Sequence, residues 1–180
     1  AFQDNISRAK LIKPPKDANA ELLTVYPIAD QHVGMLSWGP ETGENYDLEI
    51  AGNRLRSALS GLVSGAPKSQ TALIAQLGDF FHMDDATNRT PMSKNVLDAD
   101  GRLRKVIQTG IRLMCDCIDL TLRKHERVIV RNIPGNHDPN SSLILDCALI
   151  ERYRDEPRVA IIEDASEFLF HEFGQTLIGG

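Results

Sequence analysis

Three short polar signatures, each placed directly after an apolar run, constrain the fold of this chain more than any other feature. The apolar runs cover residues 22–29, 72–77 and 128–133, and the signatures that follow them are Asp30-Gln31-His32, Gly78-Asp79-Phe80-Phe81-His82 and Gly135-Asn136-His137-Asp138. Apolar runs of this length bounded by turn residues are typical of buried β-strands. Open α/β sheets have their sites where the strands end at the carboxyl edge. The sequence therefore predicts one site built from three separate segments.

Helical periodicity fills the intervals between these predicted strands. Leucines recur at helical spacing over residues 48–62, and a longer apolar stripe predicts a helix over residues 101–124. An order of strand, helix, strand, helix, strand implies parallel strands joined by crossover connections. The predicted fold class is therefore α/β.

The remaining segments are predicted from turn residues and short apolar runs. Residues 1–20 have no periodicity and contain Lys13-Pro14-Pro15-Lys16, so we expect an extended lead-in or linker there and the folded part over residues 21–180. After the third predicted strand we expect a helix over residues 143–153 and short strands at 159–162, 167–170 and 176–178.

Composition excludes several classes of protein. A chain of 180 residues with 42% hydrophobic residues can bury the core of one domain, or of a large part of one, which argues against disorder. The net charge of -5 argues against a protein that coats nucleic acid by bulk attraction, although bound cations could still hold phosphates. Cys115, Cys117 and Cys147 match no metal or redox pattern and are expected to be reduced, mostly as packing residues. Without a signal sequence or a long apolar run, we expect a cytoplasmic protein that does not span a membrane.

The residue types in the three signatures favour divalent metal ions. Carboxylate, carbonyl and imidazole ligands suit such ions at hydrolytic centres, and two ions about 3.5–4 Å apart need a shared carboxylate. Asp30 and His32 are one residue apart on a segment expected to be extended, so both should point to the same side and bind one ion. Asp79 is the predicted bridge between two ions. Asn136 is the predicted ligand of the second ion, presented by a tight turn at Gly135.

His137 is expected to face a substrate instead of binding a metal. With Asp138 as its orienting partner, the imidazole can contact phosphate oxygens or protonate a leaving alkoxide. Mn²⁺ is the expected metal, because it accepts mixed carboxylate and imidazole ligands, and Fe, Zn and Mg stay open as alternatives.

In this order, Asp-x-His, Gly-Asp-x-x-His and Gly-Asn-His-Asp resemble the signatures of the calcineurin-like metallophosphoesterase superfamily, over residues 30–138. The resemblance implies a β-sandwich flanked by helices in four α/β/β/α layers. It also implies hydrolysis of phosphoesters at a dinuclear metal centre, where a metal-bound hydroxide attacks phosphorus. The ligands that it implies are Asp30, His32 and Asp79 for one ion, and Asp79 with Asn136 for the other.

The resemblance also assigns catalytic residues. His137 and Asp138 correspond to the catalytic pair of the superfamily. The ending of Gly78-Asp79-Phe80-Phe81-His82 is similar to that of the nucleases of double-strand-break repair, whose histidine lies near the scissile phosphate, which makes His82 a further catalytic candidate. Phosphodiesters, with DNA and other nucleic acids among the candidates, are therefore favoured as substrates. A Ser/Thr protein phosphatase would instead carry Gly-Asp-x-x-Asp-Arg-Gly, which does not occur here.

The resemblance is incomplete at the C-terminal end. The later strands of the superfamily supply a Gly-His segment and a final Gly-His-x-His, and neither occurs before Gly180. We therefore expect an incomplete domain whose remaining metal ligands lie beyond Gly180, with weak or no activity. Missing strands could also leave an open sheet edge, which an oligomer or a swapped partner would cover.

Each signature also has an ordinary structural interpretation. Taken singly, the three segments could be a strand-end turn, a helix-capping turn and a tight turn chosen for backbone shape, and His82 could cap backbone groups in a loop. The competing hypothesis is accordingly a non-catalytic scaffold or binding domain that retains the fold. Of the other histidines, His125 is predicted to be a cation at a helix C-terminus, and His171 to point outward from a strand, away from the site.

Overall fold

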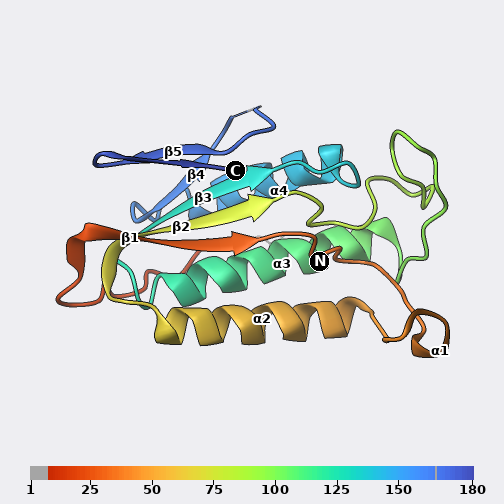
Figure 1. Cartoon of the computed structure of the whole chain (residues 1–180), viewed down its shortest axis with the longest axis horizontal. Coiled ribbons are helices and arrows are strands. Elements are labelled where there is room, and N and C mark those ends of the chain that lie inside the picture. The colour runs from red at the N-terminus through yellow and green to blue at the C-terminus, as the bar shows by residue number, and fades with distance from the viewer. Residues whose placement is uncertain (1–7, 165) are drawn as a thin grey trace.

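A four-stranded sheet is the centre of the fold in the computed structural model, which describes residues 8–164 and 166–180. The strands lie in the order β1-β2-β3-β4, and every neighbouring pair is parallel. Their bounds are β1 (Asn19–Ile28), β2 (Ser69–Leu77), β3 (Arg127–Ile133) and β4 (Val159–Ile162). The predicted α/β class and the parallel strands are therefore confirmed (Figure 1).

Three long helices connect the strands. They are α2 (Leu48–Gly65), α3 (Leu103–Thr121) and α4 (Pro139–Tyr153), and the single turn α1 (Gly39–Thr42) lies in the loop after β1. The Asp47 side chain begins α2 by accepting a hydrogen bond from the Ile50 N–H. Leu62, expected on the buried stripe of this helix, is 54% exposed, and Val63 is buried instead. In the described residues, no helix is both long enough and apolar enough to cross a membrane.

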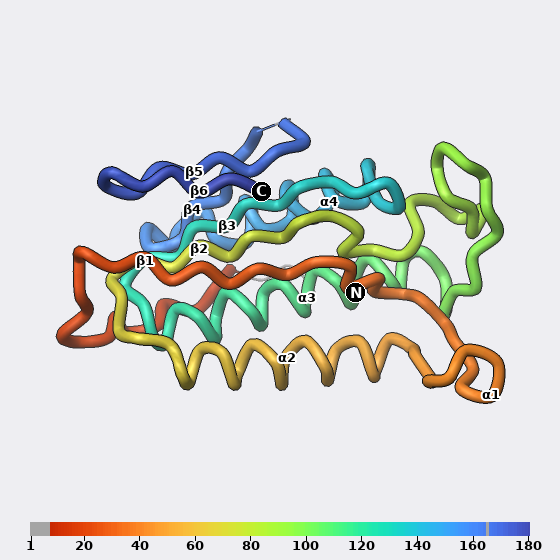
Figure 2. Tube along the Cα trace, in the orientation of Figure 1, coloured from red at the N-terminus to blue at the C-terminus, as the bar shows by residue number. Residues whose placement is uncertain are grey.

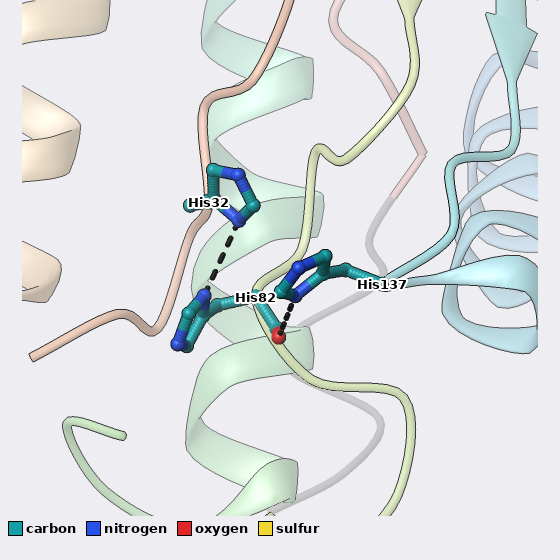
Figure 3. A group of neighbouring side chains, drawn as sticks. All are labelled: His32, His82 and His137. Carbon is teal, nitrogen blue, oxygen red and sulfur yellow. Dashed lines mark hydrogen bonds between the residues drawn. The ribbon is translucent and has the colours of Figure 1, made fainter. Parts of the chain in front are cut away.

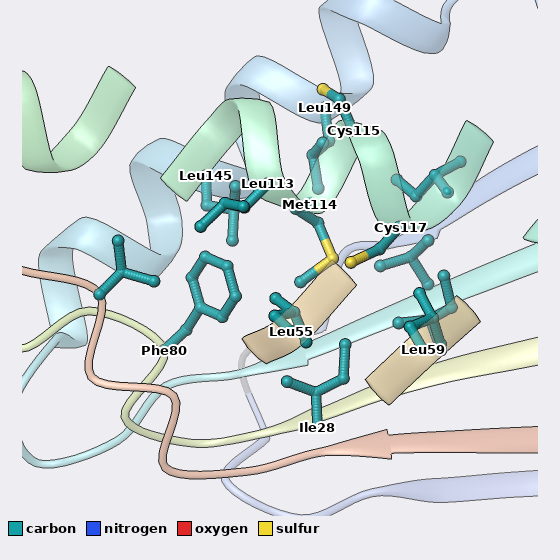
Figure 4. Close-up of a cluster of buried hydrophobic side chains, with 14 of the residues drawn as sticks. Ile28, Leu55, Leu59, Phe80, Leu113, Met114, Cys115, Cys117, Leu145 and Leu149 are labelled. Atoms are coloured by element: carbon teal, nitrogen blue, oxygen red, sulfur yellow. The ribbon is translucent and has the colours of Figure 1, made fainter. Parts of the chain in front are cut away.

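The larger hydrophobic core lies between the sheet and the three long helices. Successive residues of a strand point to opposite faces, and the residues facing the helices include Ile28, Ile74 and Val130. Figure 4 shows how side chains of α2, α3 and α4 meet this face. Cys115 and Cys117 belong to this core, and burial raises the pKa of each thiol to about 12. They pack as predicted, whereas the free Cys147 is exposed.

A hairpin covers part of the other face of the sheet. It consists of β5 (Phe170–Phe173) and β6 (Thr176–Gly179), which pair antiparallel. Figure 1 shows the hairpin above the sheet, and Leu169 and Ile178 pack there against Leu73 of β2 and Ile129 of β3. The described residues therefore form three layers: helices, sheet and hairpin. The four-layer sandwich stays a prediction, because the second sheet has two strands here and the three long helices all pack on the far side of the first.

Two predicted boundaries differ from the structure for tertiary reasons. Helix α4 begins before the expected start at residue 143, because Asp84 reaches it from the loop after β2. The Asp84 Oδ1 accepts hydrogen bonds from the backbone N–H groups of Asn140 at 2.9 Å and Ser141 at 2.7 Å. The strand expected at 167–170 is displaced toward the C-terminus into β5, whose pairing is set by the turn at Gly174, with a φ of 59°.

His125 is fully buried, and the prediction that it is a cation at a helix end is wrong. Its Nδ1 lies 2.8 Å from the carbonyl oxygen of Ser69, and its Nε2 lies 2.8 Å from the Tyr26 hydroxyl. Desolvation lowers the pKa of His125, which favours the neutral ring. Both partners are distant in sequence, so the local pattern around His125 contained no sign of this burial.

Candidate functional site

The three polar signatures leave the sheet at the same edge, after β1, β2 and β3 (Figure 2). Backbone hydrogen bonds join the first two of them directly. The Asp30 N–H donates to the Gly78 carbonyl at 3.2 Å, and the His32 N–H donates to the Asp79 carbonyl at 3.0 Å. The third signature joins the second, because the His137 N–H donates to the Asp79 Oδ1 at 2.8 Å. The three segments therefore lie side by side.

The backbone of the first signature is strained. Asp30 has a φ of 50° and His32 a φ of 45°, so both lie in the left-handed region, and the expected extended conformation is wrong. Asp79 has a φ of 52° and shares this conformation. Left-handed backbone at residues other than glycine costs about 1–3 kcal/mol each and persists where the surroundings hold it. This turn brings the His32 Nε2 to 4.0 Å from the Asp30 Oδ1.

Gln31 and Tyr46 hold this turn. The Gln31 amide donates to the Tyr46 hydroxyl at 3.0 Å and to the Ala51 carbonyl at 3.2 Å, while the Tyr46 hydroxyl donates to the Gln31 carbonyl at 2.6 Å. Sequence reasoning missed this contact, because Gln31 occupies the variable position of an Asp-x-His signature and Tyr46 lies in a loop. No local pattern could reveal it.

A close approach between two signatures explains Gly135. A Cβ at this position would lie 2.0 Å from the Asp79 Oδ1 and 2.3 Å from the Asp79 backbone nitrogen. Both distances are shorter than any real contact of a Cβ atom. Gly135 is therefore required by the proximity of Asp79, and this is a different reason from the tight turn that the sequence predicted. Gly78 has a φ of 102°, a backbone that only glycine adopts readily.

Asp30, His32 and Asp79 form a set of three metal-ligating side chains, called here the carboxylate set. One potential ligand atom of each lies within 4.8 Å of the other two. Two carboxylates and an imidazole suit a divalent ion, so these residues fit the first of the two ions that the sequence predicts. Asn136 lies at the end of β3 with an exposed side chain, next to His137. Asp79 is the residue that connects this position to the carboxylate set, through the hydrogen bond from the His137 N–H.

His32, His82 and His137 form a second set, called here the histidine set (Figure 3). The Nδ1 atoms of His32 and His82 lie 3.2 Å apart, and the His137 Nδ1 lies 2.9 Å from the His82 carbonyl oxygen, to which it can donate. The rings of His82 and His137 stack with centroids 5.3 Å apart. The sequence predicted His32 as a metal ligand and the other two as substrate contacts, and did not predict that all three rings meet.

Burial keeps two of these rings neutral near pH 7. The pKa of His82 is lowered to about 4, mainly by desolvation and also by the nearby rings of His32 and His137, while Asp79 acts against them. Desolvation also lowers the pKa of His32, again opposed by the neighbouring carboxylates. The histidine set therefore presents nitrogen lone pairs and little positive charge.

Asp138 joins the second and third signatures from inside the protein. Its Oδ2 accepts a hydrogen bond from the Phe81 N–H at 2.9 Å, and its Oδ1 accepts one from the Gly135 N–H at 2.8 Å. Desolvation raises the pKa of this buried carboxyl, and the two backbone hydrogen bonds act against that rise. Among the hydrogen bonds of the described residues, none joins Asp138 to His137, so the expected orienting contact is replaced by the His82 carbonyl.

An open cavity adjoins the carboxylate set. It measures about 460 Å³ and lies beside Asp30, and Tyr46 and Arg54 are among its lining residues. The Arg54 guanidinium carbon lies 5.6 Å from the centroid of the Tyr46 ring, and the same guanidinium pairs with Glu44 at 2.7 Å. The cavity is therefore lined by an aromatic ring and by an arginine that is paired with Glu44.

Comparison of the chain with models of protein families, with curated proteins and with solved structures gives no significant match. The likeness of the three signatures to those of the calcineurin-like metallophosphoesterases therefore remains a likeness of motifs.

Proposed function

We propose that this chain is a metal-dependent phosphoesterase that hydrolyses phosphodiester bonds, with DNA among the candidate substrates. The observation that carries the proposal is the convergence of Asp30, His32 and Asp79 from two strand ends, with one ligand atom of each within 4.8 Å of the others. Asp30, His32 and Asp79 would hold a divalent ion, which would supply Lewis-acid chemistry to a phosphoryl oxygen and would lower the pKa of a bound water. Mn²⁺ is our first choice, with Fe, Zn and Mg as alternatives.

The second ion is part of the same proposal. Asp79 and Asn136 would hold it, as the likeness to the signatures of the calcineurin-like superfamily implies. We also propose that the domain has the four-layer sandwich fold and that the protein is cytoplasmic. Association of chains through an open sheet edge is part of the same proposal.

His137 and His82 would contact the phosphate. Donation from the His137 Nδ1–H to the His82 carbonyl leaves the His137 Nε2 with its lone pair, which can accept a proton and return it to the leaving oxygen. His82 stacks on His137, so a phosphate beside one ring lies within reach of the other. Asp138 acts as a positioning residue, because it ties together the two segments that carry these histidines.

The cavity beside Asp30 supports a diester over a small monoester. A diester carries a group on each side of the scissile phosphate, and the cavity next to Asp30, lined by Tyr46 and Arg54, has room for one of them. Aromatic faces and arginines are common contacts of single-stranded nucleic acid.

The experiment that tests the proposal compares the unmodified chain with Asp79→Asn. We expect Mn²⁺ binding, counted by electron paramagnetic resonance, and slow Mn²⁺-dependent hydrolysis of bis(p-nitrophenyl) phosphate, both lost in Asp79→Asn. The asparagine retains an oxygen for the His137 N–H, so the fold should survive. Asp116→Asn, which removes an exposed ion pair with Arg56, serves as the matched control. Equal Mn²⁺ binding by Asp79→Asn, or binding without any turnover, would favour the non-catalytic scaffold.

A further inference from the structure

The histidine set has the donors of a metal site of its own. His32, His82 and His137 come from three different segments, and one nitrogen of each ring lies within 4.8 Å of the other two (Figure 3). His82 is 7% exposed, so its ring is held in place by the surrounding protein. The proposed hydrolysis uses His32 as a ligand of the carboxylate set, and His82 and His137 as contacts to phosphate. It gives the three rings no ligand in common.

The two nitrogens of His32 belong to different neighbourhoods. Its Nε2 lies 4.0 Å from the Asp30 Oδ1, in the carboxylate set, and its Nδ1 lies 3.2 Å from the His82 Nδ1, in the histidine set. His32 is therefore the one side chain that both sets share.

We propose that His32, His82 and His137 form a binding site for Zn²⁺ that is distinct from the carboxylate set. Zinc bonds to imidazole nitrogen are about 2.0–2.1 Å long, so two ligands of a tetrahedral zinc lie about 3.3 Å apart. The 3.2 Å between the Nδ1 atoms of His32 and His82 is close to that separation. Three imidazoles leave a fourth position for water, an arrangement typical of open zinc sites.

The surroundings of His137 support ligation. Histidines that bind metals usually donate their second ring N–H to a carbonyl or carboxylate, which fixes the tautomer. The His137 Nδ1 has such a partner in the His82 carbonyl, 2.9 Å away, which leaves Nε2 as the ligating nitrogen. Ligands made only of imidazole favour Zn²⁺ and the neighbouring transition ions, whereas Mn²⁺ and Mg²⁺ prefer oxygen. The two sets therefore differ in the class of metal that they select.

Sharing of His32 makes the two sites mutually exclusive. A neutral imidazole has a single nitrogen lone pair, so His32 can bind a metal through Nδ1 or through Nε2 but not through both. Zn²⁺ in the histidine set therefore removes a ligand from the carboxylate set. It also engages His82 and His137, which would otherwise contact the phosphate, so Zn²⁺ inhibits the hydrolysis. This inhibition rests on the proposed function, whereas the Zn²⁺ site itself does not.

The test uses a variant in which the carboxylate set is disabled without changing its shape. In Asp30→Asn/Asp79→Asn, we expect Mn²⁺ binding to be lost. Zn²⁺ should still bind, with the affinity that isothermal titration calorimetry gives for the unmodified chain. Addition of His82→Gln, or separately of His137→Gln, should weaken Zn²⁺ binding at least about tenfold. His171→Gln in the same background is the control, because His171 lies in β5, in the hairpin layer.

Co²⁺ provides a second readout that does not depend on affinity. Four-coordinate Co²⁺ absorbs visible light far more strongly than six-coordinate Co²⁺, so the carboxylate-disabled variant should show strong visible bands that disappear with His82→Gln. Circular dichroism checks that each variant is folded, and His137→Gln replaces His82→Gln if the latter unfolds. The proposal would be overturned if Asp30→Asn/Asp79→Asn, with all three histidines intact, no longer bound Zn²⁺. It would also be overturned if neither His82→Gln nor His137→Gln changed Zn²⁺ binding in that background. Neither readout measures turnover, so the proposed function can fail while this site stands.

Discussion

Tyr46 and Gln31 exchange hydrogen bonds across the loop that follows β1. The Tyr46 hydroxyl donates to the Gln31 carbonyl at 2.6 Å and accepts from the Gln31 amide at 3.0 Å. Gln31 lies between Asp30 and His32, whose left-handed backbone places both side chains in the carboxylate set. A tyrosine outside the three signatures therefore holds two of the residues proposed to bind a metal.

Tyr46→Phe should weaken Mn²⁺ binding more than it weakens the fold. The phenylalanine ring keeps the contact with Arg54 but loses both hydrogen bonds to Gln31. Loss of a partner that orients metal ligands typically costs about 10–100-fold in metal affinity, and we expect the lower end. Electron paramagnetic resonance of bound Mn²⁺ measures the change, with the exposed Trp38→Phe as control. Equal Mn²⁺ affinity in the two variants would show that Tyr46 does not position the loop.

Gly135→Ala should destabilise the protein by about 1–3 kcal/mol or more, as overpacking of a filled interior does. The new Cβ would overlap both the side chain and the backbone of Asp79, so neither can move aside freely. Gly61→Ala is the matched control, because nothing lies within 4 Å of a Cβ on that exposed position of α2. Alanine is favoured over glycine in a helix by about 0.5–1 kcal/mol, so Gly61→Ala should stabilise. Urea unfolding of both variants gives the comparison, and similar free energies of unfolding would contradict the close approach.

Asp138→Asn should destabilise the fold by about 1–3 kcal/mol, the cost of leaving a buried polar group unpaired. The aspartate accepts hydrogen bonds from two backbone N–H groups, whereas an asparagine offers one acceptor and turns an NH₂ group toward the other N–H. Asp116→Asn loses an exposed ion pair and should cost less than about 1 kcal/mol. A variant that unfolds at the same urea concentration as the unmodified chain would return Asp138 to the purely catalytic role that the sequence suggested.

The free energy of unfolding should fall as the pH is lowered through the range in which an unfolded histidine gains its proton. His125 should account for part of this dependence on pH. Its pKa is lowered in the folded state, so below an unfolded pKa of about 6.5 the unfolded chain binds more protons. The stabilising contribution is complete above that pKa and is lost toward the folded pKa. Urea unfolding from about pH 7.5 to pH 5.5 should give a shallower slope for His125→Gln than for the unmodified chain. The comparison uses the slope of the free energy of unfolding against pH and not its absolute value, because the glutamine also changes the hydrogen bonds to Tyr26 and Ser69. Parallel slopes would mean that His125 does not titrate with folding.

The sequence alone was enough to predict the α/β class and the meeting of the three signatures. Both follow from local patterns: apolar runs of strand length, helical periodicity between them, and the rule that parallel strands end at one edge. The boundaries of α2 and β3 were likewise close to those expected, because Asp47 caps the helix and Pro134 follows the strand within the same stretch of chain.

Only the tertiary structure decided features that depend on residues distant in sequence. The start of α4 depends on Asp84, the hydrogen bonds of the buried His125 on Tyr26 and Ser69, and the need for Gly135 on Asp79. The physical reason is the same in each case. A hydrogen bond or a close contact between distant segments forms only when the sheet brings them together, and no local pattern of side chains records it. The histidine set belongs to this class, since its three rings meet only after three strands have paired.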